Sequence, residues 1–395
     1  MKSNAGILDG VRVLEISHAI AGPTTAQVLC DYGAEVVKIE RPGGGDIFRN
    51  TSGMGPSMFL AVNRGKKSVM LDLKNPVGLR LFYELVKVSD VIVENMGPGV
   101  AQKLGVSFNK IRRTNSKAIY CRIESFGKGP YEKIPAFDPV LQASVGIMST
   151  TGFPPKKYAR AGISVVDMAT GLHAVSGILA LLYRRMITGK GGELSVSLYD
   201  AASYFMSYWI TLFDLKGKDT SPLGAAHIFG APYNLFRTRD GFVYIAVAND
   251  KAWTSFCESL GFHELLKVKE YATNRGRVAH KKSLERTISK RFRRVNSGSI
   301  MKRLKDSEVP CSKLNTVKSL LEDPHFLGSG NLWKYTYSQR NFRTVVNPAR
   351  VDGARRFSKN SPPELGANTR SVLEELLGLK DSALDKLKRA SVISY

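Results

Sequence analysis

Cysteine is scarce in this chain, and the few cysteines lie far apart. The 395 residues include only four of them, Cys30, Cys121, Cys257 and Cys311. Their spacing fits neither a zinc site, whose ligands come in close pairs, nor the disulfide framework of a small secreted domain. We therefore expect reduced, buried cysteines of a cytoplasmic protein, and no bound metal.

Long apolar runs, a leader and a dinucleotide motif are missing as well. No run of 18 or more uncharged apolar residues occurs, so we expect no membrane-spanning helix. Residues 1–10 lack the basic-then-apolar order of a signal peptide. Without a Gly-x-Gly-x-x-Gly motif, a nicotinamide or flavin cofactor is not supported. These absences favour a cytoplasmic protein with no membrane partner and no tightly bound cofactor.

Acidic residues are few relative to basic ones. The chain has 58 Lys and Arg against 34 Asp and Glu, a formal net charge of +24. Such an excess attracts nucleic acid, membrane surfaces or phosphorylated small molecules. Residues 267–305 hold fourteen of the basic residues, but only Tyr271 and Phe292 interleave with them, and no nucleic-acid-binding motif is present. We favour a solvated helical surface here, with nucleic-acid binding as the less favoured alternative.

The first part of the chain alternates strand-like and helix-like segments. Residues 11–17, 35–40, 68–73, 90–94 and 118–123 are rich in β-branched residues and short enough to be strands, and helical patterns separate them. This order predicts an α/β fold with a Rossmann-like, open parallel sheet. A chain of this length is expected to form two domains.

The pattern changes twice later in the chain. Residues 199–215 are predicted to form one buried helix, and composition shifts after it. An Asp-Gly turn between residues 232–237 and 242–247 predicts a hairpin, followed by charge-rich helices. We therefore expect a large α/β domain over residues 1–215, a smaller α+β domain over 216–325, and a return segment, 326–395, that completes the large domain.

One acid, Asp167, stands alone in an apolar segment. It precedes Met168, Leu172, Val175 and Ile178 at helical spacing. A carboxylate at such a place either caps a helix or does chemistry, and the pattern alone favours the cap. A glycine loop, residues 41–46, follows the second predicted strand, with Arg41 at its root. It is either an ordinary turn or a phosphate contact.

Several segments together resemble family III CoA-transferases, which include formyl-CoA transferase, carnitine CoA-transferase and α-methylacyl-CoA racemase. The resemblance covers nearly the whole chain in order and spacing. Its motifs include Val37-Lys-Ile-Glu-Arg-Pro-Gly43, Asn63-Arg-Gly-Lys-Lys-Ser68, Asp90-Val-Ile-Val-Glu-Asn95, the Asp167 segment and Thr188-Gly-Lys-Gly-Gly192.

The resemblance implies a catalytic role for Asp167, as the nucleophile that attacks an acyl-CoA thioester. It implies a CoA-transferase that moves CoA from an acyl-CoA to a carboxylic acid, and an intertwined homodimer. CoA is then part of the substrate. The positions that would contact it are His18, Ile20, Ala21, Arg41, Leu71, Lys74, Asn95, Met96, Gly97, Lys103 and Asp138. Since a helix N-terminus favours a negative charge, Asp167 is expected to be in its charged, nucleophilic form.

Three departures from the family pattern bear on the reaction. Phe137-Asp138 stands where racemase members have a His-Asp pair, and phenylalanine cannot move a proton, so a 2-methylacyl-CoA racemase or isomerase is the less favoured alternative. Ile20 replaces the glutamine of formyl-CoA transferase, and residues 224–230 replace its tetraglycine loop. We therefore expect an acid other than formate or oxalate. Asp138 has two open interpretations, a contact to the substrate or a cap on the helix that follows it.

Overall fold

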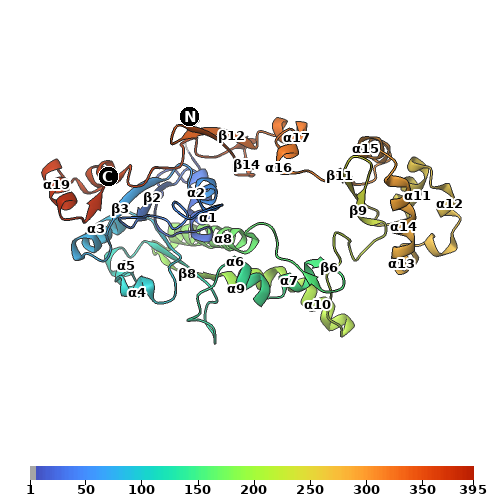
Figure 1. Ribbon diagram of the computed structural model, residues 1–395. Helices are drawn as coiled ribbons and strands as arrows, with labels where there is room; N and C mark the ends of the chain where they lie inside the picture. The colour runs from blue at the N-terminus through green and yellow to red at the C-terminus, as the bar shows by residue number, and fades with distance from the viewer. Residues whose placement is uncertain (1–5) are drawn as a thin grey trace. The chain divides into compact units, whose positions relative to one another are not determined.

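The computed structural model describes residues 6–395, which form two units (Figure 1). The first unit comprises the residues up to Ile147, Arg160–Lys218 and Ser329–Tyr395, and the second comprises Met148–Ala159 and Asp219–Gly328. The expected domain boundaries at 215/216 and 325/326 lie close to those at 218/219 and 328/329. The segment Met148–Ala159, which the sequence analysis left in the large domain, belongs to the second unit.

A seven-stranded sheet forms the centre of the first unit. Its strand order is β16-β3-β2-β1-β4-β5-β8. All neighbouring strands run parallel except β16, which pairs antiparallel with β3 at the edge. The predicted open, mostly parallel α/β sheet is confirmed. The strands are β1 (Arg12–Ile16), β2 (Glu35–Glu40), β3 (Lys67–Leu71), β4 (Val91–Glu94), β5 (Ile119–Glu124), β8 (Gly192–Ser197) and β16 (Ile393–Ser394).

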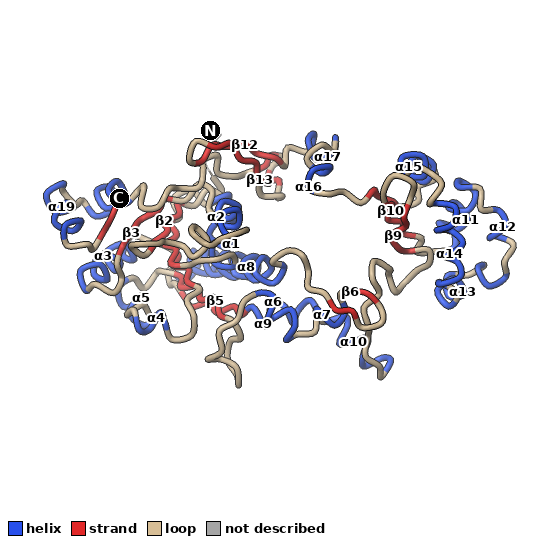
Figure 2. The backbone as a smooth tube through the Cα atoms, in the orientation of Figure 1, coloured by secondary structure: helices blue, strands red, loops and turns tan. Residues whose placement is uncertain are grey.

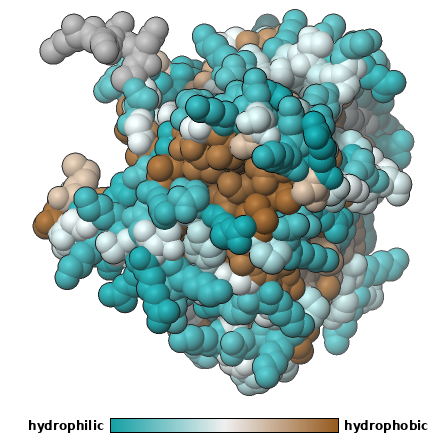
Figure 3. All heavy atoms as spheres, turned by 90° about the vertical axis from the view of Figure 1, so that its left-hand side faces the viewer, coloured by the Kyte–Doolittle hydropathy of each residue, from teal (hydrophilic) through white to brown (hydrophobic). Residues whose placement is uncertain are grey.

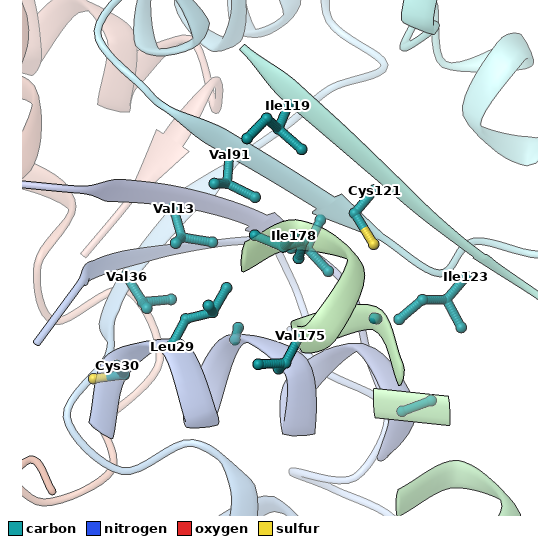
Figure 4. Close-up of a cluster of buried hydrophobic side chains, with 14 of the residues drawn as sticks. Val13, Leu29, Cys30, Val36, Val91, Ile119, Cys121, Ile123, Val175 and Ile178 are labelled. Carbon is teal, nitrogen blue, oxygen red and sulfur yellow. The ribbon is translucent and has the colours of Figure 1, made fainter. Parts of the chain in front are cut away.

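Helices cover both faces of this sheet (Figure 2). Successive strand residues point to opposite faces, so Val13 enters one core and Leu14 the other. The first core lies under α1 (Ala21–Asp31), α8 (Val165–Thr188) and α9 (Leu198–Phe205). In Figure 4, Val175 and Ile178 of α8 lie near Leu29 of α1 and side chains of the strands. The second core lies under α3 (Pro76–Lys87), α5 (Phe108–Thr114), α18 (Thr369–Leu377) and α19 (Asp381–Arg389).

Because both faces are covered, most residues of β1 to β5 are buried and apolar, as is typical of parallel sheets, and the charged residues Glu15, Lys38 and Glu40 are buried among them. The other elements of this unit are short helices and ladders near its surface. They are α2 (Gly55–Val62), α4 (Val100–Lys103), α6 (Asp138–Ser144), α10 (Ser207–Lys216), β12 (Leu332–Tyr337), β13 (Arg340–Val345), β14 (Arg350–Val351) and β15 (Ala354–Arg355). A further helix, α7 (Ile147–Thr150), spans the boundary between the units.

The prediction of one buried helix over residues 199–215 is wrong. Two helices, α9 and α10, meet at Met206, and α10 has no buried residue. The run of aromatic and aliphatic residues in α10 favours burial by its pattern alone. Instead Tyr208 and Leu215 are 63% and 79% exposed.

Within residues 6–395, one helix, α8, is long and apolar enough to cross a membrane by length and composition alone. This is weak evidence, because a core helix passes the same test, and Val175, Ile178 and Leu182 of α8 belong to the core of the sheet. The cytoplasmic location expected from the sequence stays a prediction.

The second unit combines a three-stranded antiparallel sheet, β11-β10-β9, with helices. The predicted Asp-Gly hairpin is confirmed, with Phe242 opposite Arg237. Trp253, Phe256 and Phe292 stand in its core with the hairpin residues. Its elements are β6 (Gly152–Phe153), β7 (Lys157–Tyr158), β9 (Tyr233–Arg237), β10 (Phe242–Ala246), α11 (Asp250–Leu260), α12 (His263–Leu266), η1 (Lys269–Tyr271), α13 (Asn274–Ala279), α14 (Lys281–Phe292), α15 (Ser297–Asp306), β11 (Cys311–Lys313), α16 (Val317–Leu320) and α17 (Pro324–Gly328).

The basic segment 267–305 lies in this unit, and twelve of its fourteen cations are exposed, as a solvated surface requires. Of the other two, Lys281 is half-buried and Arg277 is fully buried. Arg277 donates to the carbonyls of Ala231 and Tyr271 and to Asp250, so it is a structural residue of the core.

Candidate active site

A cavity of about 480 Å³ lies at the carboxyl ends of β1, β2, β3 and β4. Strand order reverses beside β1, because the chain runs outward from β1 to β3 on one side and from β4 to β8 on the other. Ligands of open parallel sheets bind at this kind of switch point. Six of the residues expected to contact CoA line the cavity, namely His18, Arg41, Leu71, Lys74, Met96 and Gly97.

The other expected contacts do not line this cavity. Ile20 and Ala21 are buried at the start of α1, and Lys103 lies exposed on α4. Asn95 uses its amide group internally, since Oδ1 accepts from the backbone N–H of His18 at 2.9 Å and Nδ2 donates to the His18 carbonyl at 2.8 Å. Asn95 therefore fixes His18 in place.

The glycine loop after β2 closes one side of the cavity. Gly45 has a positive φ of 63°, and a Cβ there would lie 2.6 Å from Oε1 of Glu40, so only glycine fits. Asp46 and Ile47, which follow, also line the cavity, while Arg41 is exposed at its edge. Burial, opposed by attraction to Asp46, lowers the pKa of His18, so this imidazole is neutral at pH 7.

A second cavity, of about 370 Å³, lies at the ends of β4 and β5 and shares Met96 and Gly97 with the first. The sequence did not indicate this second cavity. Its lining carries both charge signs, with Glu94, Glu124, Arg122 and Lys133. The available signal was the charged residues that end two otherwise apolar strands. Burial raises the pKa of Glu94 to about 7, although its carboxylate accepts from the N–H of Met96 and from the Tyr120 hydroxyl.

Asp167 lies in the first turn of α8, which begins at Val165 after Ser164. The prediction that Asp167 is the N-cap is therefore wrong. The capping group comes from Asp138, at the start of α6. Its Oδ2 accepts from the N–H of Val166 at 2.7 Å and from that of Asp167 at 3.1 Å. Among the open interpretations of Asp138, the structure thus shows a cap, but on α8 and not on the helix that follows it.

A glutamine completes this arrangement. Gln142 donates from Nε2 to Oδ1 of Asp138 at 2.5 Å and accepts from the N–H of Ala161 at 2.8 Å. Asp138 and Gln142 are both buried. Together they connect α6 to both ends of the loop that leads into α8, and so fix the position of Asp167.

The carboxylate of Asp167 itself has no hydrogen bond or ion pair within residues 6–395. Burial and the nearby charge of Asp138 raise its pKa to about 7. These two effects outweigh the helix N-terminus, which was expected to keep Asp167 charged. Asp138 already accepts from the first N–H groups of the helix, so they contribute less to Asp167.

Helix α1 connects Asp167 to the cavity. It begins at Ala21, just after the His18 turn. In its first turns, Thr24 Oγ1 lies 3.7 Å from Sδ of Met168, and Thr25 Oγ1 donates to the carbonyl of Gly171 at 3.3 Å. Asp167, the residue before Met168, is thereby held beside α1, the helix that starts at the cavity. Its carboxylate suits nucleophilic attack on a carbonyl carbon.

Known proteins share both this fold and this order of segments. The profile of CoA-transferase family III matches residues 8–369. The chain belongs to this family. It is therefore a CoA-transferase, as the names of its relatives also indicate.

Relatives in CoA-transferase family III match along most of their length. Succinyl-CoA:glutarate CoA-transferase of Homo sapiens is 32% identical over 99% of this chain and 91% of its own. Succinate–glutarate CoA-transferase of Agrobacterium fabrum is 34% identical over 82% of this chain and 84% of its own. Formyl-CoA:oxalate CoA-transferase of Rhodopseudomonas palustris is 31% identical over 95% and 94%.

Solved structures agree with the fold. The crystal structure of a CAIB/BAIF family protein from Brucella suis is 31% identical, has a TM-score of 0.85, and covers 94% of this chain and 100% of its own. The protein Rv3272 from Mycobacterium tuberculosis is 27% identical with a TM-score of 0.83, covering 93% and 99%.

Proposed function

We propose that this enzyme moves CoA from an acyl-CoA to a free carboxylic acid, with Asp167 as the covalent nucleophile. The observation that supports this most directly is the partly buried carboxylate of Asp167, which no neighbouring group engages and which is held at the start of α8 by Asp138. CoA itself binds in the cavity at the ends of β1 to β4.

The first half-reaction transfers CoA to the enzyme. A carboxylate oxygen of Asp167 attacks the thioester carbonyl, the carbon–sulfur bond breaks, and CoA leaves as thiolate. The thiolate then attacks the aspartyl carbonyl of the mixed anhydride. This step releases the donor acid as its carboxylate and leaves an aspartyl-CoA thioester.

The second half-reaction runs the same steps with the acceptor. The acceptor carboxylate attacks the aspartyl thioester and displaces the thiolate, and the thiolate attacks the acceptor carbonyl of the new anhydride. The products are acceptor-CoA and free Asp167 carboxylate, so no proton or electron is gained or lost. Anhydrides react readily with water, and the apolar residues beside Asp167, Val165 and Val166, help to exclude it.

Trapping the covalent species tests this mechanism. After incubation with acyl-CoA alone, hydroxylamine should convert residue 167 to a hydroxamate, seen by peptide mass spectrometry, and Asp167→Ala should lose at least about 10³-fold in turnover. Asp200→Asn, at the start of α9, is the control and should keep wild-type turnover. Near wild-type turnover by Asp167→Ala would exclude the mechanism.

Racemisation is not favoured. The relatives are named for CoA transfer, and the position that would need a second base is Phe137, 65% exposed. Deuterium entering the α-carbon of a 2-methylacyl-CoA, in the absence of any acceptor acid, would reverse this conclusion.

We further infer that the substrates are short acids. The relatives named for succinyl-CoA with glutarate, and for formyl-CoA with oxalate, all use acids of this size. Succinyl-CoA as donor, with glutarate and other short dicarboxylates as acceptors, is the first pair to assay. Greater activity with long monocarboxylic acids would contradict this choice.

A homodimer is the proposed assembly. Figure 3 shows apolar residues gathered on one face of the molecule, with hydrophilic residues around them. Helices α8, α9 and α10 also expose many large apolar side chains, as soluble monomers rarely do. These residues are Leu172, Tyr183, Met186, Ile187, Tyr204, Tyr208, Ile210, Phe213 and Leu215.

Analytical ultracentrifugation tests the assembly. Wild type should sediment as a dimer, and the double variant Met186→Glu/Tyr208→Glu should shift toward monomer. Val317→Glu, on an equally exposed residue of the second unit, is the matched control. A wild-type protein that sediments as a monomer at micromolar concentration would contradict the proposal.

A further inference from the structure

Four buried charges lie beneath the CoA cavity and belong to none of the steps above. The ammonium of Lys38 lies 2.7 Å from Oε1 of Glu15 and 3.0 Å from Oδ2 of Asp46, and Lys66 lies 2.7 Å from Oε2 of Glu15. The side chains of Lys38, Glu15, Asp46 and Lys66 in these pairs are all 0% exposed. Burying four charges is unfavourable unless each is paired, and apolar residues often replace such groups without loss of stability. Stability alone therefore does not explain why these four charged residues are buried here.

The reason lies in the turn that follows β1. Nζ of Lys38 also donates to the carbonyl of Ser17 at 2.7 Å, and Oδ1 of Asp46 accepts from the N–H of Ala19 at 3.3 Å. Asn95 engages both backbone groups of the residue between them, His18. Every backbone polar group from the Ser17 carbonyl to the Ala19 N–H is thus held by a side chain from β2, from the loop after β2 or from the residue after β4.

This turn is not a conformation that the chain adopts freely. Ala19 has a positive φ of 65°, which is uncommon for any residue other than glycine. Such a conformation persists only where the surroundings enforce it. Two of the cavity-lining residues, Ser17 and His18, lie in this turn, and a third, Asp46, holds it.

The electrostatics keep Lys38 and Glu15 charged, whereas burial lowers the pKa of Lys66 to about 8. Burial alone would raise the pKa of Glu15, but Lys38 and Lys66 outweigh burial and lower it to about 2. Burial would likewise lower the pKa of Lys38, and the charges of Glu15, Asp46 and Glu40 together raise it instead. Lys38 and Glu15 stay ionised over the whole working pH range, so the contacts to the turn are charge-assisted and strong.

We propose that Lys38 and Asp46 are positioning residues, which set the geometry of the Ser17–Ala19 turn for binding CoA. They do not contact the reacting atoms. The inference rests on the proposed function, namely that CoA binds in this cavity. The buried charges keep the turn ordered before CoA binds. A turn that had to become ordered on binding would lower the affinity for CoA.

The test compares two buried ion pairs of the same unit. Asp46→Asn keeps the volume of the side chain but removes the charge that faces Lys38. Asp31→Asn is the control, because Asp31 pairs with Arg64, is equally buried, and lines no cavity described for this unit. The probe is free CoA, measured by titration calorimetry, together with the KM and kcat for acyl-CoA and the thermal midpoint.

We expect Asp46→Asn to weaken CoA binding by about 10-fold to 100-fold and to raise KM by a similar factor, with kcat changed less than threefold. Asp31→Asn should lower the thermal midpoint at least as much and leave CoA binding within about twofold. Amide hydrogen exchange over residues 17–20 should be faster than in wild type for Asp46→Asn but not for Asp31→Asn. Lys38→Met, if it folds, should match Asp46→Asn.

Equal CoA affinity in the two variants, or a fall in kcat without a change in KM, would overturn the inference and leave the proposed function intact. Absence of CoA binding by the wild-type enzyme would overturn both.

Discussion

The carboxylate of Asp138 caps the helix that carries Asp167. One oxygen accepts from the N–H groups of Val166 and Asp167, at 2.7 and 3.1 Å. The same charge that positions the helix also raises the pKa of the proposed nucleophile, because two nearby carboxylates resist ionising together. A positional role and an electrostatic role are thus combined in one residue.

Asp138→Asn should separate these roles. The amide oxygen still accepts from the helix, but the negative charge is gone, so the pKa of Asp167 should fall. Since Asp167 attacks only as the carboxylate, the acidic limb of the kcat/KM profile should move to lower pH by on the order of one unit. Asp200→Asn should leave the limb in place. An unmoved limb in a folded Asp138→Asn protein would contradict the electrostatic role.

The raised pKa of Asp167 also predicts how stability depends on pH. The folded-state pKa of about 7 lies above the ordinary value of 3.8, so the neutral carboxyl stabilises the fold at low pH. This contribution is lost as pH rises through 7. Asp167→Asn should therefore match wild type at pH 4 and exceed its thermal midpoint at pH 8 by about 2–4 °C. The same shift at both pH values would show that burial of the charge is not the cause.

Gly171 lies where α8 packs tightly against α1. A Cβ there would lie 2.9 Å from the carbonyl oxygen of Ala21 and 3.0 Å from Thr24. Helix propensity alone would make alanine better by about 1 kcal/mol, but the two helices would have to separate, which costs about 1–3 kcal/mol. We expect Gly171→Ala to lower the free energy of unfolding.

The control for that variant is Gly298 in α15, where a Cβ meets no atom within 4 Å. Gly298→Ala should raise the free energy of unfolding by up to about 1 kcal/mol, measured by denaturant titration. Two changes of the same sign would contradict the packing argument.

Three of the four thiols should be unreactive in the native protein. Burial raises the pKa of Cys30 to about 11 and that of Cys257 to about 12, and it also raises the pKa of Cys121. Only the thiolate reacts with disulfide reagents. At pH 8 at most one thiol of the native protein, the partly exposed Cys311, should therefore react quickly with a disulfide reagent. Four should appear in guanidinium chloride, and a second fast thiol without denaturant would contradict the burial.

Local patterns predicted much of this fold. Buried strands of a parallel sheet are short apolar runs, and the predicted strands agree with β1 to β5 within two residues. The Asp-Gly turn specified its hairpin because glycine fits the positive φ there, 154° at Gly241. Segments whose environment is set elsewhere were misread. The apolar run of α10 indicated burial. The run itself does not show that no other part of the described chain packs over it.

The candidate site likewise has residues that the sequence could predict and contacts that it could not. The family resemblance named His18, Arg41, Lys74 and Gly97, and they line one cavity because residues that follow parallel strands converge at one sheet edge. The contact between Asp138 and Asp167 could not be predicted, because it joins positions 29 apart through the packing of α6 against α8. The second cavity could not be predicted either, since its charged lining combines the end of β4 with the end of β5 and the loop after it.

The sequence by itself determined the α/β class, the alternation of strands and helices that builds the sheet, and the acid that stands alone in an apolar helix. These follow from periodicity and residue type, which act over a few neighbouring residues. Only the tertiary structure decided which groups surround that acid, which charges lie beneath the cavity, and which backbone atoms they hold. Hydrogen bonds and pKa values depend on atoms within a few ångströms, and folding brings those atoms together from distant parts of the chain.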